Sequence, residues 1–426
     1  MKKVSLIAAA VAASLAAGSA FAVDFNGFVR ASTGVSGETG ADITFEKAKL
    51  GRLGNQGDNY YEFGFNEELQ TGEQTWRVES MIAQGSDSSN GWVGGDVNVA
   101  QFAVKAKGLF EFDREATLWA GKTYYQRKDV HISDFYFLDT SGTGIGIEGV
   151  TVGKDMKLSF AVIEDKGSQK SDTATEFVFD KDVCTAGEPN AGNETCYKEV
   201  ASDEDVNAHK IDLRLANIGL WENASLELAA VYNFASEGSD QTVKADDGVL
   251  ATAIIQQGLD TGFNQTVFQY GTSSYGKDMA GLGAGSYFDR SGDNNDATGF
   301  RIFNWGVAGL TDNIEIGHNV LFAKSYDVGS AKVEHDLASI VVRPMYKWND
   351  NMRSVLEVGY FTEEKGADKS EGNKFTLAQA WAMGNSWWAR PEIRIFGTYI
   401  TDSEGTTFGE KGDSDFILGA SVEAWF

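Results

Sequence analysis

The chain ends on the stretch FILGASVEAWF, Phe416–Phe426, in which two kinds of side chain alternate. Successive side chains of a β-strand point to opposite faces of its sheet. One face would carry Phe416, Leu418, Ala420, Val422, Ala424 and Phe426, and the other Ile417, Gly419, Ser421, Glu423 and Trp425. A lipid-facing strand needs such an unbroken apolar face because a charge at the bilayer midplane costs about 2 to 4 kcal/mol, whereas a water-filled lumen accepts a carboxylate. The stretch therefore predicts the last strand of a membrane-spanning β-barrel.

Two earlier segments repeat this pattern, with their charges confined to one side. In residues 388–399 one face carries Trp388, Arg390, Glu392 and Arg394, and the other carries Ile393, Ile395 and Tyr399. In residues 341–348 Arg343 and Lys347 alternate with Tyr346 and Trp348, which fall where the aromatic girdle of a membrane barrel would lie. A half-buried strand of a soluble sandwich would alternate in a similar way, so this pattern alone leaves both folds open.

The amino terminus indicates export. Lys2 and Lys3 precede the apolar run 4–17 and the small-residue end Ala20-Phe21-Ala22, a pattern that predicts a signal peptide over residues 1–22, cleaved before Val23. A membrane anchor is the alternative, but the apolar run is shorter than the roughly 20 residues that span a bilayer. We expect residues 23–426 to form one barrel domain.

The composition favours strands and excludes some partners. The chain has 49 Gly, 27 Phe, 14 Tyr and 10 Trp but three Pro, as suits many strands with tight turns, because aromatic residues fit pleated surfaces and Pro removes a ladder donor. The formal net charge of −26 becomes −28 without Lys2 and Lys3. Such acidity argues against nucleic-acid binding, which needs a basic surface, and against a pore built to attract anions.

Counting alternating segments gives about 17 to 19 strands, and the even value of 18 suits a closed antiparallel wall with both termini on the periplasmic side. We therefore predict an all-β fold, an antiparallel β-barrel of 18 strands that crosses the bacterial outer membrane many times. A barrel of that size encloses an aqueous channel unless something narrows it. The polar stretches 167–207, 236–248 and 273–297 are too long for periplasmic turns and are expected to be outer loops.

Cys184 and Cys196 lie together in the first of these loops, and in an oxidising compartment a disulfide is their expected state. A metal-binding pair is the alternative, but no His lies nearby and two thiols alone make a poor closed site. We favour the structural disulfide.

Signals for an enzyme fail on inspection. Gly144, Gly146 and Gly149 match a dinucleotide fingerprint, but residues 150–152, Val-Thr-Val, continue as strand where the fingerprint needs a helix, so close backbone packing explains them better. The four histidines have no metal-ligand spacing: His131, His209, His318 and His335. We predict no catalytic residue, metal or cofactor, although triads assemble in space and a barrel lipase or protease stays formally open.

The segment Trp119–Asp139, WAGKTYYQRKDVHISDFYFLD, resembles the inward-folded third loop of the maltoporin family, which narrows the pore. Further stretches match the family in order along the mature chain: residues 23–30, 52–55, 343–348, 388–391 and 412–415. The resemblance implies a homotrimer in outer-membrane lipid, with a constriction loop inside each barrel. It also implies passive diffusion of maltose and maltodextrins, without catalysis or an energy source.

Site residues carry over from the family by position. An aromatic slide is implied for Phe28, Tyr60, Phe263, Trp388 and Trp425. Alternation agrees where aromatics share a face with charges, as Phe28 does with Arg30, and the apolar C–H faces of sugar rings stack on aromatic faces. The alternative is that these aromatics fill space or belong to the girdle. A polar track is implied for Arg30, Arg52, Glu62, Arg127, Asp129 and Asp134, with Tyr136 as the constriction.

Carboxylates and guanidinium groups of the track can exchange hydrogen bonds with successive sugar hydroxyls, or they can brace the loop, as Arg127 would by pairing with Asp129 or Asp134. Some positions depart from the family pattern. Phe28 stands where Tyr is usual, and Ala100 stands where a lumenal Arg is expected. In the family one segment reaches into the pore entrance of a neighbouring subunit, and the matching segment of this chain contains Trp92. The last outer loop, 402–415, is short. These departures make a sucrose-type or general nonselective porin the alternative function.

Overall fold

The computed structural model describes residues 23–86, 97–166, 168–179, 197–205, 207–236, 245–286, 288–403, 408 and 412–426. Trp92, Cys184, Cys196 and the predicted signal peptide lie outside the described residues.

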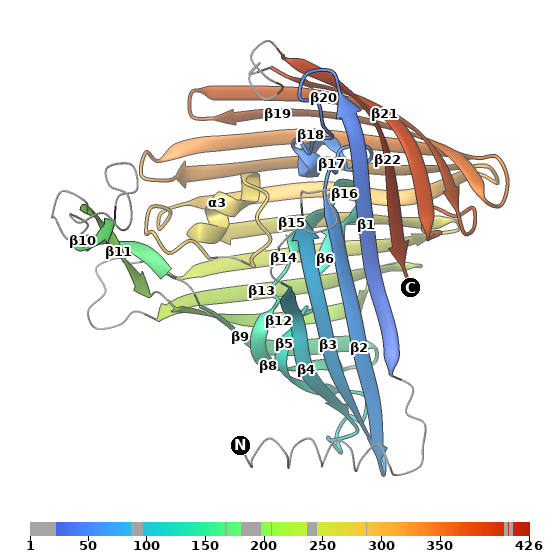
Figure 1. Cartoon of the computed structure of the whole chain (residues 1–426). Helices are drawn as coiled ribbons and strands as arrows, with labels where there is room; N and C mark the ends of the chain where they lie inside the picture. The colour runs from blue at the N-terminus through green and yellow to red at the C-terminus, as the bar shows by residue number, and fades with distance from the viewer. Residues whose placement is uncertain are drawn as a thin grey trace, which may run out of the picture.

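Eighteen antiparallel strands form one closed wall, which confirms the predicted barrel (Figure 1). The strands are β1 (Asp24–Ser36), β2 (Asn59–Thr71), β3 (Gln74–Ser86), β4 (Asn98–Lys107), β5 (Thr117–Thr123), β8 (Gly142–Val152), β9 (Met156–Asp165), β12 (Asn207–Gly219), β13 (Ala224–Ser236), β14 (Gly248–Leu259), β15 (Gly262–Thr272), β16 (Thr298–Thr311), β17 (Ile314–Val328), β18 (Val333–Lys347), β19 (Met352–Lys365), β20 (Asp368–Ala382), β21 (Glu392–Asp402) and β22 (Ser414–Trp425). The last strand pairs with the first, and Phe28 lies opposite Trp425, so the wall has no open edge.

The two faces of the wall follow the alternation seen in the sequence. In β22, Phe416 and Leu418 are 51% and 55% exposed on the outer face, whereas Glu423 is buried on the inner face. In β21, Ile393 and Ile395 point outward, and Glu392 is buried inside. The predicted segment 388–399 begins four residues before β21 begins and ends three residues before β21 ends, since β21 runs from Glu392 to Asp402.

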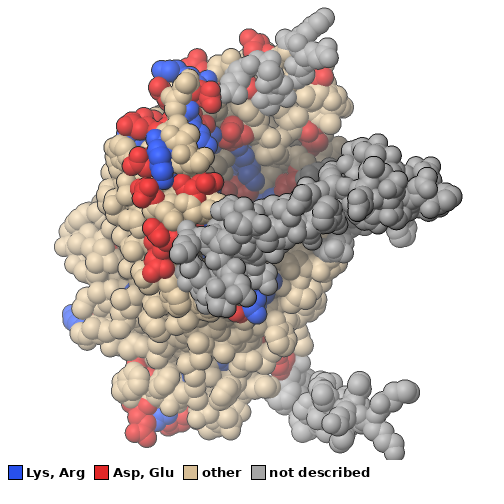
Figure 2. Space-filling model, turned by 90° about the vertical axis from the view of Figure 1, so that its left-hand side faces the viewer, with Lys and Arg blue, Asp and Glu red and all other residues tan. Residues whose placement is uncertain are grey.

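Connections at the two ends of the barrel differ in length. Short turns, such as 260–261 and 312–313, join strands at the end where β22 finishes. Long loops leave the other end, as in outer-membrane barrels, whose periplasmic turns are short and whose outer loops are long. Figure 2 looks onto the long-loop end, where Lys, Arg, Asp and Glu side chains gather around a hollow.

The long loops contain secondary structure of their own. Residues expected as one outer loop at 167–207 include the antiparallel hairpin of β10 (Ser168–Phe179) and β11 (Tyr197–Asp205). The loop at 273–297 contains α3 (Ser274–Ala280), and the loop between β1 and β2 contains α2 (Lys47–Leu50). No helix among the described residues is long and apolar enough to cross a membrane.

The glycines of the apparent nucleotide-binding motif are strand residues of β8. A Cβ on Gly144 would lie 2.3 Å from the Val162 carbonyl oxygen, and one on Gly146 would lie 2.7 Å from the Phe160 carbonyl oxygen. Close packing against β9 therefore requires Gly144 and Gly146, as predicted. Gly149 differs, because a Cβ there would meet nothing within 4 Å and its φ is +73°.

Candidate functional site

The connection between β5 and β8, residues 124–141, folds into the barrel. This confirms the prediction for residues 124–139, whereas residues 119–123 of the predicted segment belong to β5 in the wall. It contains β6 (Lys128–Val130), a 3-10 turn (His131–Ser133) and β7 (Phe135–Leu138). β6 and β7 pair with each other and not with the wall. We call residues 124–141 the constriction loop.

Side chains of the wall hold one side of the constriction loop by its backbone. The carbonyl oxygen of Ile132 accepts a hydrogen bond from Arg343 Nη2 at 3.0 Å. The carbonyl oxygen of Phe137 accepts bonds from Arg301 Nη2 and Gln269 Nε2, both at 2.9 Å. Because buried carbonyls need partners and charged donors bind them strongly, these contacts fix the loop to β15, β16 and β18.

Apolar packing reinforces the same attachment. The rings of Phe135 and Phe137 lie 5.9 and 5.0 Å from that of Phe303 on β16, in edge-on contacts, and all three side chains are buried. Burying a large side chain stabilises a structure by roughly 1.5 to 3 kcal/mol. The loop is thus a packed part of the lumen, and its opposite side is left to face β1, β2 and β22.

A cavity of about 340 Å³ lies between this free side of the constriction loop and the wall. It is lined by Phe28, Arg30, Arg52, Tyr60, Glu62, Arg127, Asp129, His131, Asp134, Tyr136 and Trp425. The structure therefore brings together the whole predicted polar track, the predicted constriction residue and three of the five predicted slide residues.

The three aromatic residues of the cavity sit on neighbouring strands. Phe28 on β1 lies opposite Trp425 on β22, and its ring is 6.1 Å from that of Tyr60 on β2. The Arg30 guanidinium lies 5.0 Å from the centre of the Tyr60 ring. Their strands place the three rings side by side on the inner wall, next to charged groups.

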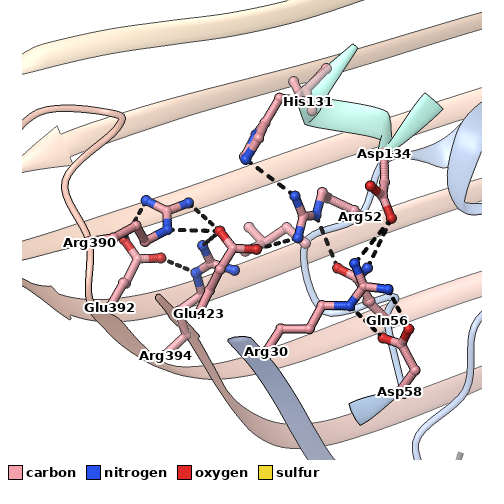
Figure 3. Close-up of polar contacts among 12 residues, drawn as sticks. Arg30, Arg52, Gln56, Asp58, His131, Asp134, Arg390, Glu392, Arg394 and Glu423 are labelled. Atoms are coloured by element: carbon pink, nitrogen blue, oxygen red, sulfur yellow. Dashed lines mark hydrogen bonds and ion pairs between the residues drawn. The ribbon is translucent and has the colours of Figure 1, made fainter. Parts of the chain in front are cut away.

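Asp134 joins the constriction loop to the opposite side of the lumen. Its carboxylate accepts a hydrogen bond from Lys47 at 2.6 Å and from Gln56 at 3.1 Å, and it lies 3.5 Å from Arg30 Nη1 (Figure 3). Burial alone would raise the pKa of this carboxyl, but Arg52, Lys47 and Arg30 overcome burial and lower the pKa to about 2. Asp134 is therefore ionised at neutral pH.

Arg52, from the loop between β1 and β2, is the centre of a second group (Figure 3). Its Nη2 pairs with Glu423 on β22, and its Nη1 lies 3.2 Å from His131 Nε2. Glu423 also accepts a hydrogen bond from Arg390 Nε at 2.8 Å. Burial and Arg52 lower the pKa of His131 well below its usual value, so the imidazole is neutral.

Arg127 does not brace the loop through Asp129 or Asp134 in the way the sequence analysis allowed. Its guanidinium instead lies 3.5 Å from the ring centre of Tyr124 and 5.0 Å from that of Tyr136. Burial raises the pKa of Asp129, and the neighbouring Asp134 raises it further. The Arg127 guanidinium and the Tyr136 ring thus form a cation–π contact within the constriction loop.

Two predicted slide residues lie outside the cavity lining. Trp388 sits in the turn between β20 and β21, 39% exposed, and its ring is 5.0 Å from that of His131. Trp388 precedes β21, so the alternation of side chains along a strand does not determine which way its ring points. Phe263 is near the start of β15, where its ring packs 4.9 Å from that of Trp305. It lies on another part of the wall from β1 and β22.

Some residues of the site escaped the sequence analysis. His131 was considered only as a metal ligand, yet its ring lies between those of Trp388 and Trp425, at 5.0 and 5.9 Å. Asp58 pairs with Arg30, and Tyr124 donates a hydrogen bond to Glu62 at 3.1 Å. Alternation had already placed Glu423 on the face of Trp425, but no local signal marks His131 or Asp58.

Metal binding has no support in the part of the chain that the structure describes, where no group of three or more His, Cys, Asp or Glu residues could hold an ion. The site offers instead aromatic faces beside hydrogen-bonding groups of both charges, a surface suited to a neutral polyhydroxylated molecule.

The comparisons of the sequence with known proteins identify one family. Residues 23–426 match the family model described as LamB porin. A maltoporin from Vibrio cholerae serotype O1 is 53% identical, with all of both chains covered. A maltoporin from Photobacterium profundum is 40% identical over 95% of this chain and 94% of that protein. A solved structure of a loop-deletion mutant of OmpT, an outer membrane protein of Vibrio cholerae, has 13% identity and a TM-score of 0.42, covering 95% of this chain and all of that chain.

Proposed function

Because the chain belongs to the LamB porin family, we propose that maltose and maltodextrins diffuse through it along the aromatic and charged lining of the constriction cavity. Family membership makes the protein a sugar-specific channel of the bacterial outer membrane and not an enzyme. The proposal adds to this the path that the sugar takes.

The observation that carries the proposal is the cavity itself. Phe28, Tyr60 and Trp425 present aromatic surfaces to water at the narrow part of the lumen, beside charges of both signs. Aromatic surface is normally removed from water, so its position here needs a reason. The flat C–H faces of glucose rings supply that reason, since they stack on aromatic faces while their hydroxyl groups stay free.

The charged groups of the lining can hydrogen-bond to the hydroxyl groups of the sugar. Arg30, Arg52, Glu62 and Asp134 already hydrogen-bond to protein partners, so the lining is satisfied without sugar. A passing hydroxyl group exchanges for one of these bonds or for a bound water at small net cost. Many similar weak contacts let a sugar chain enter and also leave, which conduction requires. Tyr136, flanked by Arg127, sets the width of the path.

The slide extends in this proposal to Trp388, beside His131 at the short-turn end, and to Phe263 at the start of β15. The protein acts as a homotrimer in outer-membrane lipid, as the family resemblance implies. The disulfide between Cys184 and Cys196 stays a prediction, because both residues lie outside the part of the chain that the structure describes.

A general or sucrose-type porin is the second candidate, and Ala100 is the observation that favours it. The residue is buried on β4 with a methyl group where the family resemblance leads us to expect an arginine. The polar track therefore lacks one charged member on that side.

Planar-bilayer conductance with added maltohexaose tests the function. Maltohexaose should reduce the ion current of single channels in a saturable way, and sucrose should do so only at much higher concentration. Equal block by both sugars would support the sucrose-type porin, and no block by either would support the general porin and contradict the proposal.

A further inference from the structure

Beneath the turn between β20 and β21 the inner wall carries a second, smaller cavity, which we call the arginine pocket. It is lined by Leu53, Arg343, Met345, Arg353, Val355, Trp387, Arg390, Glu392 and Arg394. None of these residues lines the constriction cavity. Its four guanidinium groups face one lining carboxylate, so its charge is strongly positive.

The neighbouring ion pairs do not balance this charge. Three carboxylates, Glu357, Glu392 and Glu423, serve six cations: Arg52, Arg343, Arg353, Lys374, Arg390 and Arg394. This ion-paired group therefore has three more cations than carboxylates, and Asp129 and Asp134 lie near enough to Arg52 to offset part of the excess. Lys347 and Glu315 pair with each other at 2.7 Å and add no net charge.

The excess lies in a buried place. Arg353 and Arg390 are 2% and 6% exposed, and Leu53, Met345 and Trp387 form apolar walls that are equally buried. Buried charge that lacks a counter-charge is costly, since the low-dielectric surroundings do not replace water. The protein is acidic as a whole, yet the arginine pocket in its lumen carries more positive than negative side chains.

Arg353 also has a donor without an acceptor. Its Nη1 donates to the Ser386 carbonyl and its Nη2 to the Ala389 carbonyl at 3.2 Å, but its buried Nε–H has no hydrogen-bond partner. The pocket next to it has a volume of about 20 Å³, enough for one particle the size of water. Water would satisfy the Nε–H but not the charge.

We propose that the arginine pocket binds one monatomic anion of the size of chloride. Charge, burial and the unpaired Nε–H point to an anion, and the small volume favours a monatomic anion over phosphate or sulfate. The bound anion offsets part of the positive charge. Through Arg353 it also steadies the turn whose Ser386 and Ala389 carbonyls that side chain holds, and with it the intervening Trp388.

Anomalous diffraction from crystals of the full-length mature channel grown in sodium bromide tests the site directly. We expect a bromide peak within hydrogen-bond distance of Arg353 Nε, and the same peak at reduced occupancy when chloride is added in competition. A pocket that holds water, or bromide found only on the protein surface, would overturn the proposal.

Thermal unfolding at constant ionic strength tests it in solution. Replacing sodium gluconate by sodium chloride should raise the unfolding midpoint saturably by about 1 to 3 °C, because an ion that binds only the folded state stabilises it. Arg353→Gln should abolish this rise, and Arg77→Gln, a lumenal change on β3 away from the pocket, should preserve it. If Arg353→Gln does not fold, the wild-type chloride titration still decides, and a midpoint independent of chloride counts against the site.

Discussion

At the scale of single residues, the site depends on side chains that are paired with protein and still reachable by a sugar. Arg30 and Asp134 hold each other at 3.5 Å across the lumen, and Tyr60 donates to Glu62 at 2.6 Å. Each of these contacts gives the polar groups a hydrogen-bond partner in the empty channel. At these two places a neutral sugar therefore exchanges one hydrogen bond for another and meets no unsatisfied group.

The slide predicts a specific loss when Trp388 is replaced by alanine. Maltohexaose block should weaken by about 1 to 3 kcal/mol, the range found for bases stacked on aromatic side chains, while ion conductance changes little. The measurement is sugar titration of single-channel current. Trp381→Ala is the matched control, because Trp381 is similarly exposed, at 42% against 39%, but follows the outward pattern of β20. Unchanged block in Trp388→Ala would remove this residue from the path.

Tyr136 should behave differently because it belongs to the constriction and not to the slide. Tyr136→Ala removes the ring beside Arg127 and enlarges the narrowest section, so ion conductance without sugar should rise. Single-channel recordings in plain salt measure this, with the outward-facing Tyr346→Ala as control. A conductance equal to that of the wild type would show that another group sets the width.

At the scale of elements, two loops build the narrow region together with the wall. The constriction loop is fixed on one side by β15, β16 and β18, and the loop at 273–297 supports it further, since the Asp139 N–H donates to the Ala284 carbonyl at 2.7 Å. The loop between β1 and β2 supplies Arg52 and Lys47 from the opposite side. The site is thus assembled from elements that are distant in the chain.

The loop carrying α3 contains a half-buried acid, Asp278, that makes the stability of the folded state depend on pH. Burial raises the pKa of Asp278 to about 6, against the partial opposing effect of Lys277 and Arg301. The folded state therefore binds this proton more tightly than the unfolded chain. Stability should rise as the pH falls from 7 to 5, by about 1 kcal/mol for a shift of this size, and this gain is lost as the pH rises through 6.

Asp278→Asn should remove this pH dependence and raise the unfolding midpoint at pH 7.5. Asp289→Asn is the contrasting control: burial would raise the pKa of Asp289, but hydrogen bonds from Ser291 and Lys277 lower it, so its loss should destabilise the protein at pH 7.5. Thermal unfolding of both variants at pH 5 and 7.5 measures the difference. Identical pH profiles for wild type and Asp278→Asn would rule out this carboxyl as the source.

At the scale of the whole molecule, closure of the wall governs stability. β1 pairs with both β2 and β22, and the backbone of Phe426 exchanges two hydrogen bonds with Gly27, at 2.9 and 3.1 Å. A closed barrel has no strand edge from which unfolding or aggregation can begin. The outer face meets lipid with apolar side chains, and the charges stay inside or at the ends.

We expect the native protein to be a heat-resistant trimer rich in β-structure. Unheated samples should migrate slowly in denaturing electrophoresis, boiled samples should run as a monomer, and circular dichroism should report strands before boiling. The outer face of the wall is apolar, so subunits would meet through apolar surfaces, and a symmetric trimer would bury part of them. A monomer band without heating would contradict the trimer, and a helical spectrum would contradict the fold.

Local alternation accounts for what the sequence alone determined. The faces of β18, β21 and β22 could be assigned because the period of two is a property of neighbouring residues, and lipid on one side makes the rule strict. The strand number followed from counting such segments. The constriction loop and its residues came from resemblance to a family, not from any pattern in the segment.

Only the tertiary structure decided which charges meet. Arg52 pairs with Glu423, 371 positions away, and Asp134 accepts hydrogen bonds from the first loop, because the constriction loop and the first loop fold inward from opposite sides. Trp388 contacts the His131 ring from a turn, where the alternation of side chains along a strand predicts nothing. The surplus of cations in the arginine pocket is likewise invisible in a chain whose net charge is −26, because it arises from the folding of distant segments around one point.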